Sequence, residues 1–176
     1  MTRRLLIFVV LMPLLNFTHE AGHWVGYKLC QVPVTMRFQR VEVQEKSTSR
    51  IVNVIGNWSG PTVNFLIAGI SLIYPQQLAI VGFPAISQRL AAQMFGLPLY
   101  CAGKTKFSND ETILFPEEIR LFVCLLFIFA YGVWSFKFCQ ALGFTRVSLR
   151  VSAVIIGGMF WIVYGLMLMR LDKILI

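Results

Sequence analysis

Long apolar runs alternate with short polar connections along most of the chain. The runs cover residues 5–29, 62–74, 77–100, 117–142 and 151–169. An α-helix needs about 20 mostly apolar residues to cross a bilayer, and most of these runs have that length. The third run contains Gln88, Arg89 and Gln93, whose side chains must face the interior of a helix bundle or the membrane interface. Because this third run is partly polar and the second, which ends at Pro75, is short, we expect four or five transmembrane helices.

The first apolar run begins like a signal peptide, because Arg3 and Arg4 precede an unbroken apolar stretch. A cleaved signal peptide soon reaches a small-x-small site, and residues 13–18 offer none. The helical pattern continues instead to Leu29, over about 37 Å at about 1.5 Å per residue. We therefore expect a retained transmembrane helix with a kink at Pro13.

The one extended polar stretch, residues 35–59, separates the first two apolar runs. Apolar and polar residues nearly alternate over 36–45, a polar turn follows at 46–49, and 50–55 again has the pattern of a strand. This arrangement predicts a small β-hairpin between the first and second helices. An ordinary solvated loop is the alternative.

The composition is typical of a membrane protein. Hydrophobic residues make up 57% of the chain and charged residues 14%, with a mean hydropathy of +0.70, whereas soluble domains have about 25% charged residues. The net charge of +8 comes from basic residues that stand singly or in pairs beside apolar runs, as at membrane flanks, and they form no stripe for nucleic acid. The four cysteines form no CxxC pair and indicate ordinary buried thiols. We expect an all-α polytopic membrane protein, apart from the small hairpin, with one domain over 1–176.

The first apolar run carries the motif His19-Glu20-Ala21-Gly22-His23, and its two histidines are the only histidines in the chain. Residues four apart lie on one face of a helix, so both imidazoles can bind the same zinc ion. Glu20 follows the first histidine directly and can act as the general base that takes a proton from a zinc-activated water. Ionisable groups inside a bilayer are costly unless they have a function. The motif therefore predicts a catalytic zinc site, and a hydrogen-bonded polar cluster between helices is the alternative.

A catalytic zinc ion takes three protein ligands and leaves one position for water, so one ligand must come from elsewhere in the chain. Most other carboxylates lie in the predicted hairpin, at the start of a predicted span or in the terminal tail: Glu42, Glu45, Glu117, Glu118 and Asp172. Asp110 and Glu111 remain, in a polar turn between apolar runs. We expect Asp110 to be the third ligand, with Glu111 as the alternative. Residues 108–111 also form a helix N-cap signal, so capping the following helix is another interpretation of Asp110.

These features resemble the site-2 protease family of intramembrane zinc metalloproteases. The HExxH motif lies in the first apolar helix, and a strand-like segment follows it. The segment 59–64, Ser-Gly-Pro-Thr-Val-Asn, is similar to the family's Gly-Pro-x-x-Asn motif. The family's third element is an Asp zinc ligand in a Leu-Asp-Gly setting, and Asn109-Asp110 keeps the residue type and order without that setting. The resemblance covers about residues 5–115, and the additional helices over 116–176 have no counterpart.

The resemblance implies a protease that hydrolyses a transmembrane segment of a membrane-protein substrate within the lipid bilayer. It implies that the ligands of Zn²⁺ are His19, His23 and Asp110 and that Glu20 is the catalytic base. Asn64 would bind the substrate, either by positioning its backbone or by stabilising an oxyanion; packing between helices is the other interpretation of Asn64. The edge of the hairpin would pair with an extended substrate.

We expect a multi-pass protein of the cytoplasmic membrane that binds zinc and no nucleic acid. Because the apolar runs and the hairpin account for most of the sequence, substrate selection should depend on the helix bundle, the hairpin or a regulatory membrane partner. The alternative from a different functional class is a non-catalytic membrane scaffold, a pseudoprotease that retains the metal-binding fold.

Overall fold

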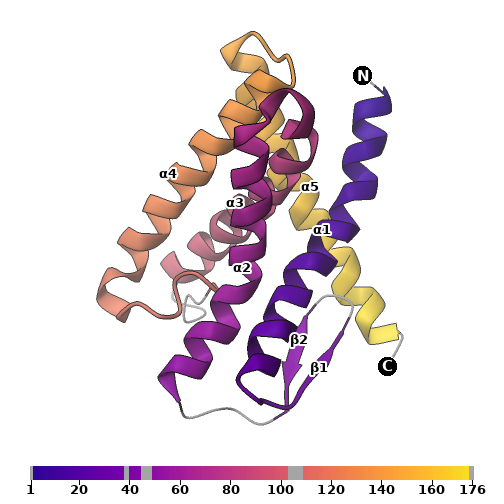
Figure 1. Cartoon of the computed structure of the whole chain (residues 1–176). Helices are drawn as coiled ribbons and strands as arrows, with labels where there is room; N and C mark the ends of the chain where they lie inside the picture. The colour runs from indigo at the N-terminus through magenta and orange to yellow at the C-terminus, as the bar shows by residue number, and fades with distance from the viewer. Residues whose placement is uncertain (1, 38–39, 45–48, 103–108, 175–176) are drawn as a thin grey trace.

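The computed structural model describes residues 2–37, 40–44, 49–102 and 109–174 (Figure 1). In these residues the chain forms five long helices and one two-stranded sheet. The elements in chain order are α1 (Thr2–Leu29), β1 (Val34–Met36), β2 (Val41–Val43), α2 (Arg50–Ile73), α3 (Pro75–Cys101), α4 (Glu117–Ala141) and α5 (Val147–Ile174). The mostly helical fold with a small hairpin between the first two long helices is thus confirmed.

Helix α3 lies at the centre of the bundle, because it packs against α1, α2, α4 and α5 (Figure 1). Its apolar side chains Phe83 and Ile86 are buried in the largest hydrophobic cluster among the described residues. Gln88, Arg89 and Gln93 are buried as well. Of the two locations that the sequence allows for these polar side chains, the structure selects the bundle interior.

Helices α1 and α2 approach each other closely because α1 presents glycines at their contact. A Cβ atom at Gly22 would lie 2.7 Å from the Ser59 carbonyl oxygen, and one at Gly26 would overlap the Ser59 side chain. Larger side chains at either position would push the two helices apart. The close approach brings the backbone of α2 against the part of α1 that carries the HExxH motif.

The hairpin is shorter than the sequence predicts and lies earlier in the chain. Its strands β1 and β2 pair antiparallel, with Val34 opposite Val43, so the predicted strand over 36–45 contains all of β2 and only the end of β1. The segment 50–55, predicted as the second strand, forms the first turns of α2 instead. That prediction was wrong because a short apolar run fits either element. In the helix, Val52 packs against the hydrophobic cluster beneath the hairpin.

The hairpin packs beside the C-terminal half of α1 (Figure 1). Val34 of β1 and Tyr27 of α1 belong to one small buried cluster. On the surface of the hairpin, the Glu42 carboxylate accepts a hydrogen bond of 2.6 Å from Arg40. Apart from Ser49, the turn predicted at 46–49 lies outside the described residues.

Gly60 and Pro61 lie in the middle of α2 and not at its start. The sequence prediction that the second helix begins after them was therefore wrong. A proline inside a helix lacks the N–H that would continue the hydrogen-bond ladder, so Pro61 donates nothing to the Asn57 carbonyl oxygen four residues earlier. The Thr62 hydroxyl donates to the Trp58 carbonyl oxygen at 2.8 Å in this turn.

The polar segment before α4 is not the cap of that helix. Helix α4 begins at Glu117, directly after Pro116, whereas residues 109–115 form turns. Thr112 donates its backbone N–H to the Asn109 carbonyl oxygen at 2.9 Å in the first of these turns. The interpretation of Asp110 as the N-cap of α4 was therefore wrong, and Ser108 of the same signal lies outside the described residues.

Two of the described helical segments are long and apolar enough to cross a membrane, Glu117–Ala141 and Val147–Met167. Helices α1 and α3 are of similar length, but buried polar groups such as His19 and Arg89 lower their hydropathy. The outer faces of the bundle nevertheless expose large apolar side chains. The exposed fraction is 57% for Leu14 on α1, 61% for Leu66 on α2 and 73% for Phe129 on α4.

Candidate metal centre

The HExxH motif lies in the C-terminal half of α1, and its three chemical groups are buried. The exposed fraction is 3% for His19, 9% for Glu20 and 8% for His23. The helical spacing places the two imidazole rings edge to face, with centroids 4.7 Å apart. Burial of three such groups in one turn requires partners for their polar atoms, and their neighbours come from α2, α3, the hairpin and the turn before α4.

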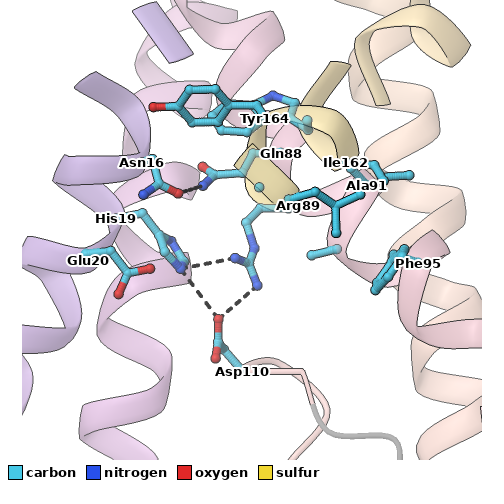
Figure 2. A pocket seen from close by; sticks show the side chains of 14 residues that line it. Asn16, His19, Glu20, Gln88, Arg89, Ala91, Phe95, Asp110, Ile162 and Tyr164 are labelled. Carbon is cyan, nitrogen blue, oxygen red and sulfur yellow. Dashed lines mark hydrogen bonds and ion pairs between the residues drawn. The ribbon is translucent and has the colours of Figure 1, made fainter. Parts of the chain in front are cut away.

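Asp110 completes a cluster of three potential metal ligands with the two histidines, and its contact with His19 is shown in Figure 2. The Nε2 atoms of His19 and His23 are 3.1 Å apart, and each lies 3.5 Å from Asp110 Oδ2. Ligand atoms that bind one zinc ion at about 2.0–2.1 Å in tetrahedral geometry are about 3.4 Å apart. The three side chains could therefore hold one metal ion without a large rearrangement.

The second nitrogen of His23 has the partner that a metal-binding histidine needs. His23 Nδ1 donates to the Gly56 carbonyl oxygen of α2 at 2.7 Å. This bond assigns the ring proton to Nδ1 and leaves the lone pair of Nε2 directed at the cluster. His19 Nδ1 is buried and has no partner among the described residues.

Gly60 makes room for the His23 ring. A Cβ atom at Gly60 would overlap the His23 imidazole, so any residue with a side chain would displace the ring. The carbonyl of Gly56 and the bare Cα of Gly60 lie one helical turn apart on α2 and both contact this ring. A glycine at residue 60 therefore has a direct role in the geometry of the centre.

The structure separates the two neighbouring carboxylates that the sequence leaves as alternatives. Asp110 contacts both histidines, whereas Glu111 is fully buried and binds Arg89, Gln93 and Tyr131. Of these two carboxylates, Asp110 is therefore the one that lies against the histidines, as the sequence predicts. Its role as a zinc ligand stays a prediction.

Arg89 joins the cluster to the rest of the bundle. Its guanidinium donates to both oxygens of Glu111 at 2.7 and 2.6 Å and to Asp110 Oδ2 at 3.1 Å. Its Nη1 atom also lies 3.1 Å from His19 Nε2 (Figure 2). Arg89 thus connects α3 with α1 and with the turn that carries Asp110.

Asp110 is held in its ionised form. Burial alone would raise the pKa of Asp110, but the imidazole groups of His19 and His23 and the charge of Arg89 outweigh it and keep that pKa well below its usual range. A carboxylate must be ionised to bind a metal ion. Asp110 is therefore in the protonation state that a ligand needs.

A cavity of about 270 Å³ opens beside the cluster (Figure 2). Glu20, His19 and Asp110 line one side of it, together with polar residues of α3. Helix α5 lines another side with Trp161 and Tyr164. The cavity therefore places an apolar wall opposite the polar groups of the centre.

Glu20 borders this cavity at its hairpin side. The backbone of Val41 on β2 lies close to its carboxyl group. The strand β2 therefore reaches the residue that the sequence predicts as the catalytic base.

Asn64, the predicted substrate-binding residue, lies fully buried between α2 and α3. Its Nδ2 atom donates to the Ala85 carbonyl oxygen at 3.0 Å and to Gln88 Oε1 at 2.9 Å. Gln88 in turn donates to Asn16 Oδ1 at 3.1 Å (Figure 2). These contacts are those of a helix-packing amide, and a role of Asn64 toward a substrate stays a prediction.

Sequence reasoning missed two parts of the site. It noted Arg89 only as a polar residue that must avoid lipid, although an arginine in an apolar helix is itself a signal of function. It assigned no role to the last helix, whose residues Trp161 and Tyr164 form a wall of the cavity. That contribution has no local signal, because it depends on how α5 packs against α3.

No protein-family model, curated protein or solved structure matches the chain. The chemistry of the centre is therefore inferred from its motif and its geometry.

Asp110→Ala should abolish metal binding because it removes one of three ligands from a preformed cluster. We expect zinc affinity to fall by more than about 100-fold, beyond the effect of losing an outer hydrogen-bond partner. The metal content of the purified protein after dialysis, measured by elemental analysis, checks this. Glu42→Ala, which removes a carboxylate of the hairpin surface, is the control and should retain zinc. Equal zinc content in both variants would contradict the assignment.

Gly60→Ala should weaken metal binding without removing any ligand, because its methyl group displaces the His23 ring. We expect zinc affinity to fall at least about 10-fold, as it does when a metal-binding side chain loses its own hydrogen-bond partner. The matched control is Gly69→Ala in the same helix, where an added Cβ meets no atom within 4 Å. Competition with a fluorescent zinc chelator measures both affinities, and the same affinity in both variants would sink the explanation.

Proposed function

We propose that the protein is an intramembrane zinc metalloprotease that hydrolyses a peptide bond in or near a transmembrane segment of another membrane protein. The observation that carries this proposal is the convergence of Asp110 with His19 and His23, at separations that suit one tetrahedral ion, directly beside Glu20. An HExxH helix with a third carboxylate ligand is the donor set of a hydrolytic zinc site.

The charges of the cluster favour a divalent cation. With neutral histidines and a protonated Glu20, the Asp110 and Glu111 carboxylates exceed the single positive charge of Arg89 by one negative charge, and ionisation of Glu20 would add a second. A divalent ion would balance this buried excess, and uncompensated buried charge is costly. Two imidazoles and a carboxylate suit zinc, and also iron(II), better than magnesium or calcium. The adjacent Glu20 carboxyl group favours hydrolysis, and therefore zinc.

The proposed reaction assigns one task to each side chain. His19, His23 and Asp110 would hold the ion, which supplies Lewis acidity and lowers the pKa of water when bound. Glu20 would take a proton from the attacking water and deliver it to the leaving nitrogen. The cavity beside Glu20 offers space for the peptide at this position.

The membrane location is part of the proposal and rests on the outer surface of the bundle. Helices α4 and α5 have the length and hydropathy of transmembrane spans. The exposed apolar side chains of α1 and α2, such as Leu14 and Leu66, would be in contact with lipid if these helices also cross the bilayer. We infer four or five spans, with the polar groups of α1 and α3 directed inward.

The hairpin is the proposed binding site for the extended substrate. A two-stranded sheet has unpaired edges, and an extended peptide can add to such an edge through backbone hydrogen bonds. Strand β2 lies within hydrogen-bond reach of Glu20 through Val41. A peptide paired with the hairpin would therefore enter the cavity beside the proposed base.

A second candidate function is a non-catalytic membrane scaffold that uses the same polar cluster for structure. The contact of Arg89 Nη1 with His19 Nε2 favours it, because an arginine already satisfies one of the ligand atoms. In that case the cluster would join α1, α3 and the turn before α4 without any metal ion.

Glu20→Gln separates the two functions. The variant should retain one zinc ion per chain and lose cleavage by about 10²–10⁴-fold, the usual contribution of a general base. The assay uses purified protein in lipid vesicles and a synthetic single-span peptide with a fluorophore and a quencher on opposite sides of its apolar segment. Glu118→Gln, at an exposed residue in the first turn of α4, should cleave like the wild type. Undiminished cleavage by Glu20→Gln, or a wild-type protein without zinc, would refute the proposed protease.

A further inference from the structure

The Arg89 guanidinium is held by a two-point contact with Glu111, whose carboxylate is itself held by other side chains. Both oxygens of Glu111 accept bonds from its Nε and Nη2 atoms, and the same oxygens also accept bonds from Tyr131 Oη at 2.9 Å and Gln93 Nε2 at 3.1 Å. Glu111 thus receives donors from α3 and α4, and it fixes the plane of the guanidinium. The remaining edge of that plane, Nη1, points toward the metal centre and the cavity (Figure 2).

The contact between Arg89 Nη1 and His19 Nε2 cannot coexist with a metal ion on His19. A neutral imidazole has one lone pair, which either accepts a hydrogen bond or binds the metal. Once His19 binds an ion, Nη1 therefore needs another acceptor beside the ligand atoms. A substrate carbonyl oxygen bound in the cavity would be such an acceptor.

Asn64 does not provide this donor, and Arg89 is the one fixed cationic donor in the lining of the cavity. Asn64, the residue predicted to stabilise an oxyanion, has two amide hydrogens, and its Nδ2 atom already donates to Ala85 and Gln88. Among the residues that line the cavity, Arg89 is the only arginine or lysine. A fixed cation at the point where negative charge develops is the arrangement that stabilises an oxyanion most effectively.

We propose that Arg89 is a catalytic residue that donates from Nη1 to the oxyanion of peptide hydrolysis and that Glu111, Gln93 and Tyr131 are its positioning residues; this inference rests on the proposed protease function. Water adds through its oxygen to the carbonyl carbon, its proton passes to Glu20, and the carbonyl π electrons move onto the carbonyl oxygen that Arg89 faces. On collapse the C–N bond breaks, and the proton on Glu20 passes to the leaving nitrogen. One water is consumed, and a carboxyl group and an amine are formed.

A purely structural role for Arg89 makes different predictions. If Arg89 only anchors the turn that carries Asp110, its loss should release zinc and lower turnover in proportion. If it stabilises the oxyanion, its loss should spare zinc and substrate binding and lower kcat. Binding of a tetrahedral anionic mimic, a peptide phosphinate, distinguishes these roles without any turnover.

The experiment compares the wild type with the double variant Arg89→Gln/Glu111→Gln, which removes both charges of the buried pair together, while the partly exposed Asp110 keeps its contacts with His19 and His23. Arg120→Gln is the matched control, because Arg120 binds the same turn through the Phe115 carbonyl oxygen at 2.7 Å but does not line the cavity. We measure zinc per chain, kcat and KM with the quenched single-span peptide, and phosphinate affinity.

We expect the double variant to keep one zinc ion per chain and a similar KM while kcat falls by about 10²–10³-fold, the usual effect of losing an oxyanion donor. Phosphinate affinity should fall with kcat, and Arg120→Gln should match the wild type. Tyr131→Phe should lower kcat by a smaller factor at unchanged zinc content. It removes one hydrogen bond to Glu111 but leaves the proposed donor, Arg89, in place.

Two outcomes overturn the inference. One is wild-type kcat and phosphinate affinity in the double variant, and the other is loss of zinc from that variant in proportion to activity. Either result would leave a zinc-dependent wild type that requires Glu20, so the proposed function would stand. Failure of the wild type to bind zinc or to depend on Glu20 would instead refute the proposed function.

Discussion

The buried ion pair of the Arg89 guanidinium with Glu111 is the interaction around which the centre is arranged. The turn over 109–115 belongs to neither α3 nor α4, and this pair holds it against the bundle. Because buried charges must be paired, Glu111 lies against an arginine of the central helix α3. The neighbouring Asp110, which is partly exposed, faces the histidines of α1 and contacts both of them. The Arg89–Glu111 pair costs desolvation energy, but it brings α3 and the turn over 109–115 together at one point.

The packing of α1 against α2 supplies the other half of the geometry. The carbonyl of Gly56 orients His23, and the missing side chain of Gly60 leaves space for its ring. Asn64 then ties α2 to α3 through Ala85 and Gln88. The Gly-Pro-x-x-Asn segment that resembles the site-2 protease family has a packing role in this structure, because it contacts the helix that carries the HExxH motif and the helix that carries Arg89.

The sequence was sufficient where one local pattern determines the outcome. The HExxH spacing placed both histidines on one face, and the long apolar runs predicted the helices, although α2 begins earlier than Pro61 suggested. The segment 50–55 was misassigned because its apolar pattern fits a strand as well as a helix, and only packing decides between them. The direction of Asp110 and the wall formed by α5 depend on contacts across the bundle, which no local pattern encodes. Arg89 was noticeable in the sequence as a charged residue in an apolar run, but no local pattern identified Glu111 and Tyr131 as the residues of its hydrogen-bond network.

X-ray absorption at the zinc edge of the purified, zinc-loaded protein tests the central claim most directly. Two imidazole nitrogens and one carboxylate oxygen should appear, at about 2.0–2.1 Å, in a four-coordinate shell completed by one further light atom. The imidazole contribution should disappear in His19→Ala/His23→Ala. A spectrum with sulfur at about 2.3 Å, or a shell of oxygens alone, would contradict the account, because zinc would then lie away from His19, His23 and Asp110.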